Sequence, residues 1–353
     1  MMKISSKIAL AFGLISLVSC SDKLVPVQED ALKPIVITEK LPHDTDDPAI
    51  WIHPTDPSKS IVIGTDKDTN GGLYAFDLGG IIVGKSKVLK RPNNVDIAYG
   101  LVLNGKKVDI AVTTERETSK IRVFSLPDLK PLDDGGISVF DGEELCAPMG
   151  IALYTRPEDQ SIFAIVGRKD GPSETYLWQY ELSDNGRGIV GGKVVRKFGK
   201  YSGKKEIEAI AVDNELGYVY YCDEQFGIRK YYANPALNDN QELALFGQGD
   251  FKSDNEGIAI YKKSVTEGYI LVSNQQANTF MVYPREGVSG NTNSYPLVAE
   301  IPTSTIECDG VEVTNVNLGG SFANGLFVAM SNGMTFQYYS WDSIQELIDV
   351  QKK

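Results

Sequence analysis

The stretch Asp47-Pro48-Ala49-Ile50-Trp51 decides the fold, because variants of it recur along the chain. The shared pattern is an acidic or polar residue, a small or turn residue, and then alternating apolar residues. The other copies are Val95–Tyr99, Met149–Leu153, Glu208–Val212, Glu256–Ile260 and Asp309–Val313. They follow one another at intervals of 48 to 59 positions, and such an interval is typical of a repeat architecture.

Each copy opens a unit of several short strands. In the first unit, further β-branched and aromatic runs follow at Ile61–Gly64, Leu73–Phe76 and Ile81–Val83, and such runs favour strands. The sixth unit lacks a fourth run and ends in a helical-looking tail at Ser343–Ile348, but an orphan run, Ile35–Thr38, precedes the first unit. The sequence therefore predicts an all-β fold, a six-bladed β-propeller closed by an N-terminal strand, over a large sandwich or two β domains.

The N-terminus has the features of a secretory signal. Lys3 and Lys7 precede the apolar run Ile8–Val18, which is shorter than the ~20 residues that a membrane-spanning helix needs. The run ends in Leu17-Val18-Ser19-Cys20, which resembles the bacterial lipobox, so Cys20 is the expected lipidation site. The alternative is an ordinary signal peptide that is cut nearby.

These features divide the chain into three parts. We expect a lipoprotein signal peptide in residues 1–19, a tether in residues 20–33 and the propeller in residues 34–353. The expected location is outside the cytoplasm, as a bacterial lipoprotein in the periplasm or at the cell surface, with the lipid anchor as its only contact with the membrane.

The composition narrows the possible partners. The chain has 35 Lys and Arg residues against 47 Asp and Glu residues, a formal net charge of −12. This charge argues against a nucleic-acid partner, since such binding needs a basic patch. An anionic substrate would need clustered bases or bound cations. No feature of the sequence indicates an oligomer, so a monomer is expected.

Propeller topology gathers the acidic residues on one rim. The first strand of a blade runs along the axis and the second runs back, so the start of one and the end of the other share a rim. Four of the six copies begin with an acid: Asp47, Glu208, Glu256 and Asp309. Asp44, Asp46, Asn93, Asn94, Asp96 and Asp254 lie beside the copies, and Glu224 follows a second strand. The bases Lys67, Arg116, Arg168 and Lys169 also follow second strands.

This collection of side chains favours calcium. Carboxylates that lie close together repel one another and need a counter-charge. Oxygen ligands without His or Cys suit Ca²⁺ better than zinc or copper. Bound calcium beside Lys and Arg would neutralise phosphate oxygens and activate water. The only histidines, His43 and His53, are not in an Arg-His-Gly run, which argues against a phosphohistidine mechanism.

Two segments carry a family resemblance. The run from Asp44 to Trp51 and the run from Asn93 to Gly100 resemble the two signatures of the β-propeller phytases. The resemblance implies a calcium-dependent phosphatase that hydrolyses phosphomonoesters of myo-inositol hexakisphosphate (phytate) through metal-activated water. It implies that several calcium ions are held by Asp46, Asp47, Glu208, Glu224, Glu256 and Asp309, with another near Asn94 and Asp96. Among these, Glu208, Glu224 and Asp309 would be catalytic, and Lys67, Arg116, Arg168 and Lys169 would bind substrate phosphate.

The sequence departs from the family pattern at two positions. The Arg of the second signature is Ala98 here, and a Tyr expected at the start of the third repeat is Met149. Met offers no hard oxygen ligand, so the departures leave a changed or reduced activity open. Two alternatives therefore remain: a calcium-dependent lactonase-type propeller enzyme, and a non-catalytic ligand-binding propeller.

Overall fold

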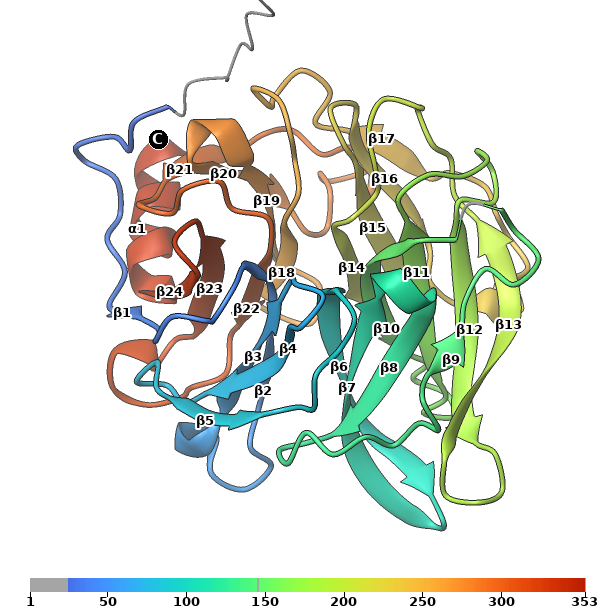
Figure 1. Ribbon diagram of the computed structural model, residues 1–353. Helices are drawn as coiled ribbons and strands as arrows, with labels where there is room; N and C mark the ends of the chain where they lie inside the picture. Colours follow the sequence, from blue (N-terminus) through green and yellow to red (C-terminus); the bar gives the residue numbers. More distant parts are fainter. Residues whose placement is uncertain (1–24, 145, 353) are drawn as a thin grey trace, which may run out of the picture.

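Six four-stranded antiparallel sheets form the body of the molecule. A computed structural model describes residues 25–144 and 146–352, and within these ranges the sheets are arranged as blades around a central axis (Figure 1). The innermost strands contact one another in a closed ring, in the order β2, β6, β10, β14, β18, β22 and back to β2. The prediction of a six-bladed β-propeller is thus confirmed. The expected signal peptide, Cys20 and the first part of the expected tether lie outside the described residues.

The first three blades follow the chain in simple order. Blade one contains β2 (Thr45–Trp51), β3 (Ile61–Asp66), β4 (Gly72–Phe76) and β5 (Ile82–Lys85). Blade two contains β6 (Pro92–Leu103), β7 (Lys106–Glu115), β8 (Lys120–Ser125) and β9 (Ile137–Ser138). Blade three contains β10 (Pro148–Thr155), β11 (Ile162–Arg168), β12 (Leu177–Asp184) and β13 (Val190–Phe198).

The last three blades continue the pattern, and the final blade takes its outer strand from the N-terminal segment. Blade four contains β14 (Ile210–Asp213), β15 (Tyr218–Asp223), β16 (Gly227–Tyr232) and β17 (Ala244–Phe246). Blade five contains β18 (Ile258–Lys262), β19 (Gly268–Asn274), β20 (Thr279–Pro284) and β21 (Ala299–Pro302). Blade six contains β22 (Val311–Thr314), β23 (Leu326–Ser331), β24 (Thr335–Ser340) and β1 (Val36–Ile37), which pairs with β24.

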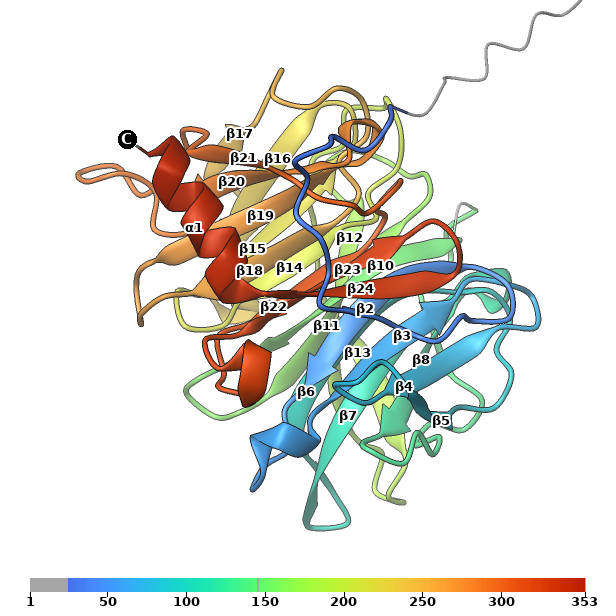
Figure 2. The same cartoon turned by 90° about the vertical axis from the view of Figure 1, so that its left-hand side faces the viewer.

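Short helices punctuate the connections. The 3-10 helices are η1 (Pro57–Lys59), η2 (Arg116–Thr118), η3 (Pro235–Leu237), η4 (Gln275–Ala277) and η5 (Gly320–Phe322). The α-helix of the described residues, α1 (Trp341–Gln351), buries Trp341, Ile344 and Ile348 on one face. The Trp341 ring stacks on Tyr261 with centroids 3.4 Å apart. The helix contacts β21 and β24 and so covers their outer side (Figure 2).

The core lies between blades rather than within any one of them. Ile63 of blade one, Val95 and Ala111 of blade two belong to a single buried cluster. Phe76 of blade one meets Phe336 of blade six edge to face, with centroids 5.8 Å apart. Each blade therefore buries apolar side chains on both faces, which explains why the strand runs are almost continuously apolar.

Three inner strands begin with the same irregularity. In blade one, Thr45 pairs with Asp66 and Pro48 with Gly64, so two residues oppose one and form a bulge. Corresponding register shifts occur between Pro92 and Val95 and between Pro148 and Ile151. A bulge redirects adjacent side chains, and Asp46 and Asp47 are the two residues at the bulge of β2.

Gly310 is required by the close approach of two inner strands. A Cβ atom there would lie 2.5 Å from the Cα of Asp47 and 2.6 Å from the carbonyl oxygen of Asp46. We therefore expect Gly310→Ala to lower the free energy of unfolding by roughly 1–3 kcal/mol, the usual cost of overpacking. Thermal unfolding of the purified variant measures this loss.

Gly84→Ala is the matched control, because the nearest atom to its added Cβ would be Ala75 Cβ at an ordinary 3.6 Å. A Gly310→Ala variant as stable as Gly84→Ala would contradict the packing argument.

Candidate metal centre and active site

Five of the predicted metal ligands meet on one rim of the propeller. Asp46 belongs to the bulge of β2, Glu224 directly follows β15, and the others stand just before inner strands: Glu208, Glu256 and Asp309. The side chains of Asp46 and Glu224 are 1% and 0% exposed. Carboxylates this deeply enclosed must have partners or counter-charges, because an isolated buried charge is costly.

Lys67 pairs with the carboxylates on one side of this cluster. Its ammonium nitrogen contacts Oδ1 of Asp46 and lies 3.3 Å from Oδ2 of Asp309. Burial alone would lower the pKa of Lys67, but the carboxylates of Asp46, Glu208 and Asp309 raise it above the ordinary value. Lys67 is therefore a permanently charged member of the cluster.

Lys205 pairs with the carboxylates on the other side of the cluster, and the sequence analysis did not identify it. Its Nζ lies 3.1 Å from Oε2 of Glu224, 2.8 Å from Oδ2 of Asp254 and 2.9 Å from Oε1 of Glu256. Its pKa is also raised, because the attraction of Glu256, Asp254 and Glu224 exceeds the effect of burial. The signal that could have found it is the pair Lys204-Lys205 shortly before the copy that starts at Glu208.

Two side-chain amides join the halves. Asn93 Nδ2 donates to Oδ2 of Asp46 at 2.9 Å and also to Oε1 of Glu208. Gln275, in η4, donates from Nε2 to Oε2 of Glu256 at 2.9 Å and to Oδ1 of Asp309 at 2.5 Å. The amides thus hold neighbouring carboxylates apart and aim their remaining oxygens inward.

The arrangement fits divalent cations with oxygen ligands. Among the described residues, two groups of three carboxylates have one oxygen each within 4.8 Å of the others: Glu206, Glu208 and Glu224; Glu224, Asp254 and Glu256. Glu224 belongs to both groups; its Oε1 accepts no hydrogen bond from the described residues, and its Oε2 lies 3.1 Å from the Lys205 ammonium. Both groups consist of carboxylates alone, with no His or Cys among their members, and such oxygen ligands match the donor set of calcium or magnesium.

The carboxyl groups hold their protons strongly when no cation is bound. Burial raises the pKa of Glu208 to about 7, with a further contribution from Asp46. Burial raises the pKa of Glu224 to about 8, partly offset by Lys205. Burial and the nearby Asp309 raise the pKa of Glu256 to about 11. Two lysines are thus too few to neutralise the cluster, which explains why it would favour divalent cations.

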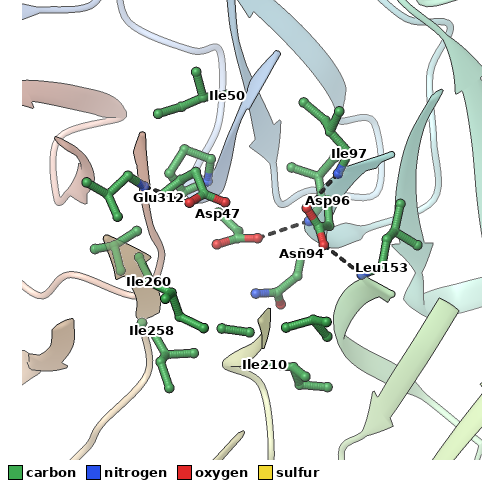
Figure 3. A pocket seen from close by; sticks show the side chains of 18 of the residues that line it. Asp47, Ile50, Asn94, Asp96, Ile97, Leu153, Ile210, Ile258, Ile260 and Glu312 are labelled. Carbon is green, nitrogen blue, oxygen red and sulfur yellow. Dashed lines mark hydrogen bonds between the residues drawn. The ribbon is translucent and has the colours of Figure 1, made fainter. Parts of the chain in front are cut away.

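Three other carboxylates point into the central channel instead (Figure 3). Asp47, Asp96 and Glu312 line a cavity of about 210 Å³ between the inner strands. Backbone amides satisfy them: Val95 N donates to Asp47 at 3.0 Å, Leu153 N to Asp96 at 2.6 Å and Val313 N to Glu312 at 2.6 Å. Asp47 and Asp96 therefore each tie their own blade to the next one.

The channel and the rim cluster are formed by mostly different residues. Asn94 lines it as well, whereas its neighbour Asn93 is the residue that reaches the rim cluster. Burial raises the pKa of Asp96 to about 6 and, with help from Asp96, that of Glu312 to about 8. The structure thus places five of the eight predicted ligands on the rim and three, Asp47, Asn94 and Asp96, in the channel, and Glu256 of the rim set also borders the channel. It adds Asp254 and Glu206 to the rim set and Glu312 to the channel set.

The predicted phosphate-binding bases do not all reach the rim surface. Lys169 is half-exposed and pairs with Glu206 at 3.2 Å, and Arg116 lies partly exposed in η2. Arg168 is fully buried: its guanidinium lies over the Phe140 ring at 4.7 Å, and its Nη2 donates to the carbonyl of Thr175 at 3.1 Å. Its guanidinium lies against the connection from β9 to β10, where Nη1 also pairs with Glu143 at 3.4 Å, and its expected role in binding phosphate stays a prediction.

Both departures from the family pattern are buried. Ala98 in β6 and Met149 in β10 are each 2% exposed. The carbonyl of Met149 accepts a hydrogen bond from Oγ1 of Thr114 at 2.7 Å. Ala98 and Met149 therefore both contribute to packing in this chain.

The fold and the site define a propeller whose rim carries an enclosed carboxylate cluster that could hold metal ions, and comparisons with known proteins give its family. The model of the phytase family matches residues 9–351. A 3-phytase of Bacillus subtilis (strain 168) is 32% identical over 318 residues, which cover 85% of this chain and 80% of that protein. The chain belongs to the phytase family, and the expected enzyme class, phosphoric monoester hydrolase, is confirmed.

A more distant likeness concerns the fold alone. The structure of a luciferin-regenerating enzyme superposes with a TM-score of 0.53 at 12% identity, covering 86% of this chain and 95% of that one. In the part of the chain that the structure describes, no helix is both long and apolar enough to cross a bilayer.

The raised pKa values predict how stability depends on pH. Glu208 and Glu224 have an ordinary pKa of 4.5 but titrate near 7 and near 8 in the folded state. The metal-free folded protein therefore binds protons that the unfolded chain has released, so stability falls as pH rises through this window. We expect a slope of about 1.4 kcal/mol per pH unit for each such carboxyl.

Chemical denaturation of metal-free protein at several pH values between about 5 and about 8 measures the slope. Glu224→Gln removes one of the carboxyls, so its slope should be shallower. An identical slope in the variant would contradict the assignment to Glu224.

Proposed function

We propose that this chain is a calcium-dependent phosphatase that hydrolyses phosphomonoesters of phytate. The observation that carries the proposal is Glu224, which belongs to both carboxylate groups and whose buried Oε1 accepts no hydrogen bond from the described residues. Membership of the phytase family and the name of the Bacillus subtilis relative, 3-phytase, support the substrate. Calcium is proposed because every donor in the cluster is a hard oxygen.

The rim carboxylates would hold the cations. Glu208, Glu224, Asp254 and Glu256 form one end of the site, and Asp46 and Asp309 the other. Bound divalent cations neutralise phosphate charge and lower the pKa of water, so that water can attack phosphorus. Asn93 and Gln275 orient the carboxylates through their amide hydrogens, and this keeps the donor set in place before substrate arrives. We propose catalytic roles for Glu208, Glu224 and Asp309 within this set.

The basic side chains would bind the substrate. Lys67, Arg116 and Lys169 stand around the cluster on blades one to three. Phytate carries several separated phosphate groups, and charge-assisted hydrogen bonds from bases at separate positions would orient it with one phosphate over the cations. Asp47, Asn94 and Asp96 would serve the channel, where we propose a structural calcium rather than a catalytic one.

We also propose that the enzyme works outside the cytoplasm as a monomeric lipoprotein anchored through Cys20. The support is the sequence of residues 3–20, with its lysines, its short apolar run and its lipobox-like end. Phytate is too charged to cross a membrane unaided, so an enzyme on the outer side meets it directly.

The decisive assay is phosphate release from phytate by the soluble chain starting after Cys20. Turnover with millimolar Ca²⁺ is expected, with loss in EDTA and weak release from a simple aryl phosphate. The reason is that the site depends on cations and on several phosphate subsites. Folded, calcium-loaded protein that releases no phosphate from either substrate would contradict the proposal and leave a lactonase or a binding propeller to be tested.

Arg116→Ala tests the phosphate subsites. Loss of one charge-assisted contact, worth about 1.5–3 kcal/mol, should raise KM for phytate roughly tenfold or more while thermal stability stays the same. Lys59→Ala is the matched control, since Lys59 belongs to η1, which follows the far end of β2 on the opposite rim. A KM equal to that of the control would remove Arg116 from the site.

A further inference from the structure

Lys205 occupies the place in the rim cluster where a cation would bind. Its Nζ lies between 2.8 and 3.1 Å from one oxygen each of Glu224, Asp254 and Glu256. The same three residues form one of the two carboxylate groups whose oxygens are mutually within 4.8 Å. The ammonium group therefore stands at the focus of these oxygens, where a calcium ion with ligands at about 2.3–2.6 Å would have to stand.

The position is specific to one of two adjacent lysines. Lys204 turns away, donates from Nζ to the carbonyl of Gln225 at 3.0 Å and lies 5.3 Å from the centre of the Phe226 ring. Both residues belong to the connection from β13 to β14, which enters the rim just before Glu208. Because only Lys205 reaches the carboxylates, its contact is a property of the site and not of a generally basic loop.

The Lys205 side chain is also able to move away from the carboxylates into solvent. Its side chain is 32% exposed, whereas that of Glu224 is 0% exposed, so the Lys205 side chain borders solvent while the carboxylate that it pairs with does not. A lysine has a flexible stem and keeps a strongly hydrated charge, which makes the exposed position accessible. A divalent cation at the same three oxygens would repel the ammonium and supply twice its charge.

We propose that Lys205 is a resident counter-ion that competes with divalent metal for Glu224, Asp254 and Glu256 and swings into solvent when metal binds. It thereby sets the calcium concentration at which this part of the site fills. In the metal-free protein it holds three mutually repelling carboxylates together. The proposal rests on the proposed function, since it takes calcium as the metal.

Calcium binding by calorimetry tests the competition. Metal-free wild type, Lys205→Gln and Lys204→Gln are titrated with CaCl₂ at one pH and ionic strength. Lys205→Gln should bind calcium about tenfold more tightly than wild type, because no ammonium has to be displaced. Lys204→Gln loses the same charge from the same loop, and its affinity should match that of the wild type. Equal affinities in the two variants, or weaker binding by Lys205→Gln, would overturn the proposal.

A second measurement needs no variant and therefore holds even if Lys205→Gln folds poorly without metal. Wild-type protein is labelled with an amine-reactive reagent, with and without CaCl₂, and each lysine is followed by mass spectrometry. Labelling of Lys205 should increase several-fold with calcium while that of Lys204 stays constant. Unchanged labelling of Lys205 in calcium-loaded protein would overturn the proposal.

The two readouts separate this inference from the proposed function. Calcium-dependent release of Lys205 without phosphate release from phytate would sustain the inference and reject the proposed activity. Wild-type protein that binds no calcium would reject both.

Discussion

The repulsion among carboxylates at one rim is the constraint on which the rest of this site depends. Asp46, Glu208, Glu224, Glu256 and Asp309 come from four blades and are all enclosed or nearly so. Such a set is tolerable only with counter-charges. Lys67 and Lys205 provide two, and the remaining excess is carried by bound protons or by metal. A closed ring of blades is needed to hold the set together against its own repulsion, because the apolar layers between blades resist opening.

The channel shows what the same residue types do when they are satisfied. Asp47, Asp96 and Glu312 accept hydrogen bonds from backbone amides, two of them across the boundary between blades. On the rim, Oε1 of Glu224 accepts no hydrogen bond from the described residues, and its Oε2 faces the Lys205 ammonium rather than a backbone amide. The contrast separates carboxylates that stabilise the ring from carboxylates that remain available to a ligand. The bulge at Asp46 and Asp47 lets two adjacent residues fall into different classes.

Much of this could be predicted from the sequence, and the misses have physical reasons. The interval between copies of the inner-strand motif predicted the blades, and the motif's first residues predicted Glu208, Glu256 and Asp309 on one rim. Asn93 rather than Asn94 reaches the cluster because a bulge, invisible in the pattern, sets the direction of both. Arg168 was predicted in the turn after the second strand of blade three; it is the last residue of that strand, and its guanidinium packs on Phe140 of the connection from β9 to β10. Lys205 was missed because loop residues follow no period.

The sequence by itself determined the number of blades, the family and the rim on which the acidic residues gather, because periodic apolar patterns and local motifs suffice for these. Only the tertiary structure decided which carboxylate oxygens lie close together and which carboxylates face the channel. It also decided which lysine lies among Glu224, Asp254 and Glu256. These contacts join residues from different blades. Their geometry depends on bulges and loop paths that are settled by packing between blades and not by any local pattern.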